Sequence, residues 1–106
     1  MTQDELLQKI KERLQELYGP RFRGLVLYGS AARGEMGPDS DIDLLCLLEG
    51  PVSLWKEIGA TVEATRDLDV EEGPYRPIEI IPVDIEDYEA GEFGFIKEVQ
   101  REGVPL

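Results

Sequence analysis

The chain has 106 residues, with 23 acidic and 11 basic side chains and a formal net charge of −12. This charge argues against direct nucleic-acid binding, because Lys and Arg supply most contacts to a phosphate backbone. Histidine is absent and Cys46 is the sole cysteine, which excludes an internal disulfide and the usual thiolate or imidazole zinc sites.

The length predicts one domain over residues 1–106, built around one modest core. No apolar run is long enough to cross a bilayer, and the polar first residues lead into a helix rather than a secretion signal. We therefore expect a cytoplasmic protein with no membrane association.

The first 28 residues predict a helix followed by a strand. Thr2 and Glu5 have the spacing of a capping box, and apolar residues then recur at helical spacing until Gly19-Pro20 interrupts the pattern. A short apolar strand is expected over residues 24–28.

A turn and a second strand follow. Residues 30–33 predict the start of a short helix, and residues 34–39, which contain a Gly-Pro pair, predict a loop. Residues 41–48 predict a strand, in which Cys46 is expected to be a small buried apolar residue rather than a reactive thiol.

The second half predicts a helix from Ser53 to about Arg66, with Trp55 expected to pack in the core rather than to stack on a base. Residues 67–76 are acidic, contain a Gly-Pro pair and predict a flexible loop. A third strand is expected over residues 77–83, followed by a Glu-rich segment and a helical pattern that begins near Phe93.

This order of elements predicts an α/β (α+β) fold: a small mixed sheet with helices mainly on one face.

Asp41 and Asp43 flank one apolar residue in an otherwise apolar strand. Side chains at i and i+2 share a face of a strand, so both carboxylates point the same way and require a proton, a cationic side chain or a metal ion. Oxygen ligands beside phosphate favour magnesium. Taken alone, the pair is more often two solvated side chains on an exposed strand face.

Gly29 and Ser30 follow the first strand. Glycine lets a backbone approach phosphate closely, and the Ser30 hydroxyl adds a hydrogen-bond donor, so this turn can bind a triphosphate. A Gly-Ser pair alone also marks ordinary turns. Ten residues separate this turn from the first of the two aspartates, and the turn and the aspartates together are much more specific than either part alone.

The pattern Gly29-Ser30, ten residues, then Asp41-x-Asp43, with Arg33 between them, resembles the signature of the DNA polymerase beta-like nucleotidyltransferase superfamily. At this length the chain is similar to the minimal, MntA-type nucleotidyltransferases, which are often paired with HEPN-domain partners. The resemblance implies the polymerase beta-like palm arrangement of sheet and helices.

The resemblance also implies roles for particular residues. Two magnesium ions are expected on Asp41, Asp43 and a third carboxylate, and the Gly29-Ser30 turn is expected to bind the triphosphate. Glu79 is the candidate third ligand, because residues 77–83 form the only other strongly apolar run with one carboxylate. Family members more often carry aspartate at this position.

The sequence leaves two interpretations open for each of two side chains, Glu79 and Arg33. Glu79 could instead lie on an exposed edge-strand face, which the prolines at positions 77 and 82 favour. Arg33 could bind triphosphate charge or could only tie its loop to the acidic cluster.

By resemblance, the favoured activity is transfer of AMP from ATP to a hydroxyl side chain of a HEPN-domain toxin, which would make the chain an antitoxin. The acceptor would be carried by another protein, or a neighbouring subunit would complete the cleft. The alternatives are a catalytically weak module that neutralises its partner by steric cover, and a small-molecule nucleotidyltransferase.

Overall fold

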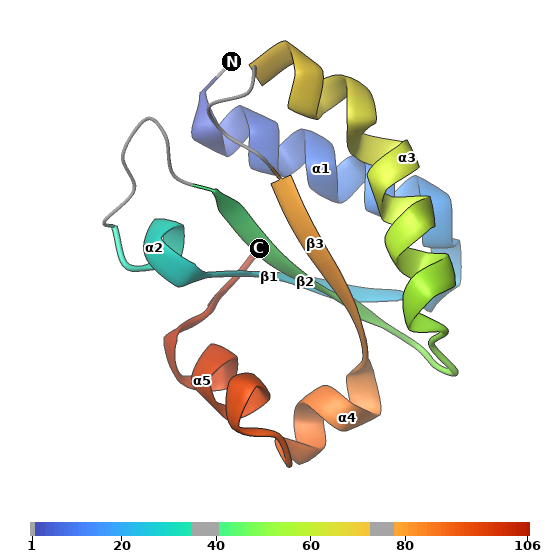
Figure 1. Ribbon diagram of the computed structural model, residues 1–106, viewed down its shortest axis with the longest axis vertical. Helices are drawn as coiled ribbons and strands as arrows, with labels where there is room; N and C mark the ends of the chain where they lie inside the picture. Colours follow the sequence, from blue (N-terminus) through green and yellow to red (C-terminus); the bar gives the residue numbers. More distant parts are fainter. Residues whose placement is uncertain (1, 35–40, 73–77) are drawn as a thin grey trace.

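The computed structural model describes residues 2–34, 41–72 and 78–106. They form a mixed sheet with one layer of helices on each side (Figure 1). In chain order the elements are α1 (Gln3–Tyr18), a 3-10 turn (Gly19–Arg21), β1 (Phe22–Tyr28), α2 (Gly29–Ala32), β2 (Ile42–Leu48), α3 (Leu54–Glu72), β3 (Ile78–Asp84), α4 (Ile85–Ala90), α5 (Gly94–Glu102) and β4 (Val104–Pro105).

The sheet has four strands in the order β3-β2-β1-β4. β1 pairs antiparallel with both β2 and β4, whereas β2 and β3 are parallel and are joined through α3. The predicted mixed sheet is therefore confirmed. Its register aligns Tyr28 with Asp43 and Asp43 with Glu79, so three polar side chains form one row across the sheet.

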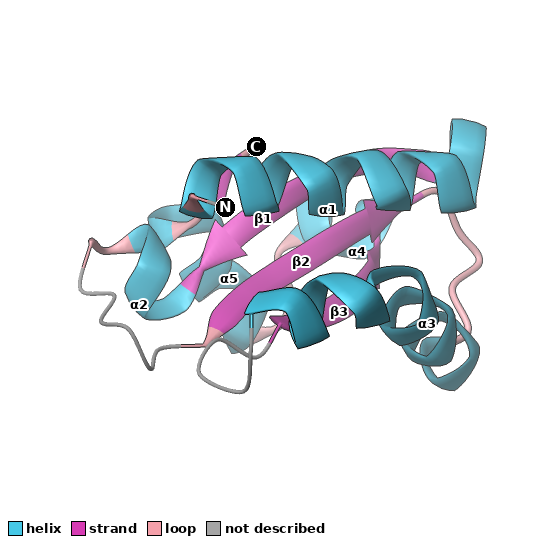
Figure 2. Cartoon of the chain, turned by 90° about the horizontal axis from the view of Figure 1, so that it is seen from above, coloured by secondary structure: helices cyan, strands magenta, loops and turns pink. Residues whose placement is uncertain are grey.

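β2 is the centre of the core, because all its side chains except Asp43 are buried. Its even-numbered residues, among them Cys46, pack against α1 and α3, and Leu45 and Leu47 pack toward Val99 of α5 on the other face. Figure 2 shows the two long helices together on one face. The short helices α4 and α5 add a smaller second layer that the weak C-terminal periodicity suggested only in outline.

The first helix begins as predicted. The Glu5 backbone N–H donates to the Thr2 hydroxyl oxygen at 3.1 Å, and that hydroxyl donates to the Glu5 carboxylate at 3.2 Å. The first of these bonds satisfies the Glu5 N–H, one of the N–H groups that the first helical turn leaves without partners.

The helix after β2 is longer than predicted. Residues 67–72, expected to be loop, continue α3 to Glu72, and residues 73–76 lie outside the described residues. Two contacts explain the extension: Leu68 is buried in the core, and the Arg13 guanidinium makes two hydrogen bonds to the Asp67 carboxylate at 2.7 and 2.9 Å. The acidic composition concealed a helix that is held by contacts with α1.

Leu68→Ala is expected to lower the free energy of unfolding by about 2–5 kcal/mol, because it leaves a cavity between α3 and the sheet. Chemical denaturation would measure the change. Leu54→Ala on the same helix is the matched control, since Leu54 is 45% exposed and should cost about 1 kcal/mol or less. Equal losses for the two variants would contradict the packing of this end of α3.

The prediction that Trp55 packs in the core is wrong, because its side chain is 83% exposed. Trp55 lies on the same side of α3 as Ile58 and Val62, because these residues come three and seven positions later in the helix. Among the described residues, no helix is long and apolar enough to span a membrane.

Candidate active site

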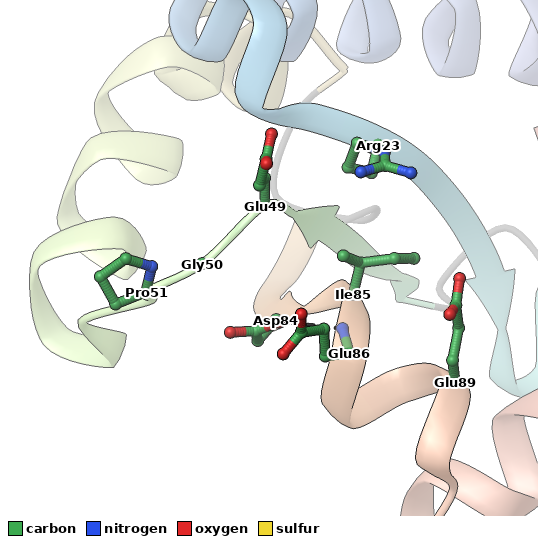
Figure 3. Close-up of a pocket in the computed structure, with 8 residues that line it drawn as sticks. All are labelled: Arg23, Glu49, Gly50, Pro51, Asp84, Ile85, Glu86 and Glu89. Atoms are coloured by element: carbon green, nitrogen blue, oxygen red, sulfur yellow. Dashed lines mark hydrogen bonds between the residues drawn. The ribbon is translucent and has the colours of Figure 1, made fainter.

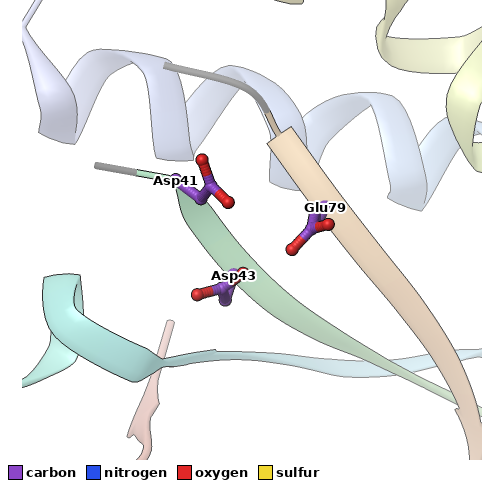
Figure 4. A group of neighbouring side chains, drawn as sticks. All are labelled: Asp41, Asp43 and Glu79. Atoms are coloured by element: carbon purple, nitrogen blue, oxygen red, sulfur yellow. The ribbon is translucent and has the colours of Figure 1, made fainter. Parts of the chain in front are cut away.

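Three carboxylates from two strands meet at one end of the sheet (Figure 4). Asp41 immediately precedes β2, Asp43 lies in β2, and Glu79 is the register partner of Asp43 in β3. One oxygen from each side chain lies within 4.8 Å of the others. The sequence expectation that these three side chains converge agrees with the structure.

Electrostatics at this cluster favour binding of a cation. Burial raises the pKa of Asp43 to about 6, and a hydrogen bond with Glu79 and the charges of Glu79 and Asp41 add to the shift. Among the described residues, no ion pair joins these carboxylates to Lys or Arg. A set of oxygen donors with uncompensated charge fits magnesium or a similar hard divalent ion.

The turn after β1 lies directly against this cluster. Gly29 has φ +74°, a conformation that favours glycine, and a Cβ atom there would lie 2.6 Å from Asp43 Oδ2. Ser30 follows in the first turn of α2 and is half-buried. The sequence-predicted turn and the aspartates are therefore adjacent in space as well as in the motif.

Arg33 lies at the end of α2 and pairs with Glu102 of α5, with 3.7 Å between guanidinium nitrogen and carboxylate oxygen. Both side chains are partly exposed, so this pair contributes little stability. The pair ties the turn to α5, a contact that neither interpretation from sequence included.

Two aromatic residues beside the turn escaped the sequence analysis. The Tyr28 ring meets Phe95 of α5 edge to face, with 5.5 Å between centroids. Burial raises the pKa of Tyr28 to about 12, with smaller effects from Asp43 and Glu79, so its hydroxyl stays protonated and cannot serve as a base. Both rings line a cavity of about 110 Å³ that also reaches Gly29 and Arg33. In the sequence, the only indication that either ring lies at the site is the position of Tyr28 directly before Gly29.

A larger cavity, of about 510 Å³, lies elsewhere in the described part of the chain (Figure 3). It is lined by Arg23, by Glu49 after the end of β2, by Asp84 at the end of β3, and by Glu86 and Glu89 of α4. The carboxylate cluster lies at the opposite ends of β2 and β3, about 20 Å away along seven-residue strands. The cavity lined by Arg23 has four acidic side chains and one basic one, and this excess of negative charge makes it unsuitable for a triphosphate.

Comparison with known proteins gives one match over most of the chain and several to parts of longer proteins. A family model described as a nucleotidyltransferase domain matches residues 7–103. An aminoglycoside nucleotidyltransferase (4') from Staphylococcus aureus is 37% identical over 51 residues, which are 45% of this chain and 20% of that protein. The match thus spans about a fifth of the length of that curated relative.

Two solved structures share the fold. Spectinomycin adenyltransferase AAD(9) from Enterococcus faecialis, with ATP and spectinomycin, superposes with a TM-score of 0.66 at 19% identity, over 81% of this chain and 36% of that one. A mutant of the toxin-antitoxin MntA-HpeT superposes with a TM-score of 0.56 at 11% identity, over 99% of this chain and 72% of that one. At these identities the likeness concerns the fold.

Proposed function

This chain belongs to the nucleotidyltransferase domain family, and from that premise we propose that it transfers AMP from ATP to a hydroxyl group of a partner protein. The observation that carries the proposal is the meeting of Asp41, Asp43 and Glu79 beside a turn in which only glycine fits. A turn that phosphate can approach closely, beside carboxylates that can hold its cations, suits a metal-bound triphosphate.

Each part of the cluster has a role in the proposed reaction. Magnesium, two ions by the family resemblance, would be held by Asp41, Asp43 and Glu79 and would offset the negative charge of the triphosphate and the leaving pyrophosphate. The Gly29 backbone admits the triphosphate closely, and the Ser30 hydroxyl donates a hydrogen bond to it.

The bond changes follow from this placement. The acceptor oxygen forms a bond to the α-phosphorus while the bond from that phosphorus to the bridging oxygen of the β-phosphate breaks, and pyrophosphate leaves. The acceptor proton passes to the Glu79 carboxylate, since the protonated Tyr28 is unable to take it.

A protein acceptor is supported by charge and by one structural neighbour. The net charge of −12 favours a basic partner. The toxin-antitoxin neighbour aligns with 99% of this chain. We therefore propose that the acceptor belongs to a HEPN-domain toxin and that the chain acts as its antitoxin.

A small-molecule acceptor is the second candidate, because one sequence relative acts on aminoglycosides by its name and one fold neighbour was solved with spectinomycin. Neutralisation by steric cover is the third, since Glu79 stands where the family more often has aspartate. These three functions differ in whether label from ATP is transferred and to what.

The test is incubation with Mg²⁺ and ATP labelled at the α-phosphate, in the presence of a toxin encoded beside this chain, an aminoglycoside, or neither. Label in the toxin supports the proposal, and label in the aminoglycoside assigns the second candidate. Neutralisation of the toxin without label would contradict the proposed transfer and leave steric cover. ATP labelled at the γ-phosphate is the control, because nucleotidyl transfer releases that label as pyrophosphate.

Gly29→Ala is expected to lower transfer by about 100-fold or more, because its methyl group would displace the Asp43 carboxylate from the cluster. Gly34→Ala is a matched control: Gly34 also has a positive φ, of +72°, but its Cβ would meet no atom within 4 Å. Both variants place an alanine at nearly the same positive φ. Equal activity of the two variants would contradict the close fit of the turn on Asp43.

A further inference from the structure

The outer edge of β3 offers unpaired backbone groups. In the described part of the chain β3 is an edge strand that pairs with β2 alone, at the margin of the sheet beside α3 (Figure 2). Pro82 has no N–H and is tolerated within a strand where its nitrogen faces away from the ladder. Backbone groups of alternate residues face the same side, so Ile78 and Ile80 direct N–H and C=O outward with Pro82.

Two grooves follow this edge along its length. One, of about 280 Å³, is lined by Ile58 and Val62 of α3 and by residues 78–81 of β3. The second, of about 400 Å³, continues beside Pro82 and is bounded by α3 on one side and by Phe93 on the other. An extended polypeptide has the shape that fits a groove along a strand.

The walls of these grooves carry apolar side chains in solvent: Phe93 is 62% exposed and Val62 is 51% exposed. Trp55, which is 83% exposed, is not in either wall but lies on the same side of α3 as Ile58 and Val62. Single exposed apolar residues are ordinary, but a group of them along an unpaired strand edge is typical of a contact surface for another protein. We name the outer edge of β3 together with Trp55, Ile58 and Val62 the β3 track.

The acidic side chains along the track indicate what binds it. Glu79 lies on the face of β3 opposite α3, and Asp87 of α4 lines the second groove on that same face. A second copy of this chain would bring another −12 charge and another acidic β3 to the same edge. Charge complementarity therefore favours a basic segment over self-association.

We propose that the β3 track binds an extended basic segment of a partner polypeptide, which adds a strand to the sheet. Side chains of that segment alternate between the two faces. Those facing α3 are apolar and cover Trp55, Ile58 and Val62. Those facing the opposite side are Lys or Arg, and beyond the carboxylate cluster they meet Asp87.

Glu79 belongs both to the carboxylate cluster and to the first groove. A segment bound at the track therefore brings its end, or the surface that follows it, beside the cluster. This consequence rests on the proposed function: the track would position the acceptor hydroxyl. Strand addition itself does not depend on transfer activity.

Trp55 is the only tryptophan of the chain, and the bound segment would cover its side of α3, so its emission is the readout of occupancy. The probe is a short peptide of alternating valine and lysine, titrated into the whole chain. We expect a saturable blue shift of Trp55 emission and slower exchange of the Ile78 and Ile80 amide hydrogens by NMR. Two further peptides carry N-methyl groups on one or the other set of alternate residues. Methylation of the residues whose N–H groups face β3 should abolish both signals, and methylation of the other set should leave them.

Val62→Glu should weaken peptide binding by about tenfold or more. Val104→Glu is the matched control, since Val104 is 41% exposed but lies in β4 at the other edge of the sheet. No emission change at millimolar peptide, or unchanged exchange at Ile78 and Ile80, would overturn strand addition. A blue shift that grows with protein concentration alone, with doubled mass, would assign the track to a second copy and overturn the proposal.

These outcomes are separable from those of the transfer assay. Peptide binding with no label transfer to any acceptor counts against the proposed function and supports the track. Label transfer that Val62→Glu leaves unchanged, together with absent peptide binding, counts against the track alone.

Discussion

Asp43→Asn is expected to abolish nucleotidyl transfer while making the metal-free protein more stable. Loss of this ligand should remove several kcal/mol of transition-state stabilisation, or about 10³-fold or more in rate. Stability should rise because ionised Asp43 is partly buried and lies against Glu79 and Asp41; burial first, and then these neighbours, raise its pKa to about 6. After a discount for solvent screening we expect about 1 kcal/mol, or roughly 5 °C in Tm.

The measurements are label transfer with α-labelled ATP and thermal unfolding in EDTA, both at pH 7.5. Glu89→Gln is the control, because it removes one exposed charge from α4, at the other end of the strands. It should leave both quantities nearly unchanged. Retained transfer in Asp43→Asn would remove Asp43 from the catalytic cluster, and a fall in Tm would show that Asp43 is structural.

Loss of transfer and gain of stability in Asp43→Asn have the same cause, which is the closeness of the three carboxylates to one another. Three carboxylates close enough to share one cation repel one another when that cation is missing. The fold supplies the opposing energy through β2, whose remaining side chains are all buried. A site that is unfavourable in the metal-free chain is expected where charge has a functional use.

The cluster was predictable from sequence because it depends on strand geometry. Alternation puts Asp41 and Asp43 on one face, and the lone carboxylate in the third apolar run left Glu79 as the candidate on a neighbouring strand. The parallel register of β2 and β3 then aligns Asp43 with Glu79. Short-range periodicity and one strand pairing were sufficient for this part of the structure.

Contacts between distant segments were not predictable in the same way. The Tyr28–Phe95 and Arg33–Glu102 pairs depend on how α5 folds back under β1, which no local pattern encodes. The extension of α3 depends on Arg13, which lies 54 residues before its partner Asp67. Both features become visible only after the layers are assembled.

Trp55 shows a different limit of sequence reasoning. Apolar residues at helical spacing identify a stripe, but the pattern is the same whether that stripe faces the core or a partner. On α3 the core is contacted by Leu68 together with the buried Thr61 and Thr65, and the stripe with Trp55 is left in solvent. Threonines on the buried side weakened the signal that would have separated the two faces.

A divalent ion is expected to stabilise the protein strongly at neutral pH and weakly at acidic pH. At a free Mg²⁺ concentration about 100-fold above its dissociation constant, binding to the folded state alone adds about 2.7 kcal/mol, or roughly 14 °C in Tm. Thermal unfolding with and without Mg²⁺, or with Mn²⁺ as a substitute, measures this between pH 5 and pH 8. Asp43→Asn should lose most of the increment, and Glu89→Gln should keep it.

The sign of the pH dependence follows from Asp43. Its pKa in the folded, metal-free chain is about 6, above the ordinary value of 3.8, so the folded state binds the proton more tightly than the unfolded state does. The contribution of this group to metal-free stability is therefore complete below about pH 4 and is lost as pH rises through about 6. Ion binding requires the carboxylate form, so the ion-induced increment follows the opposite course: it grows above about pH 6 and fades below it. An increment that is the same at pH 5 and pH 8 would mean that the ion binds without Asp43, and the convergence of the three carboxylates would then have no role in binding it.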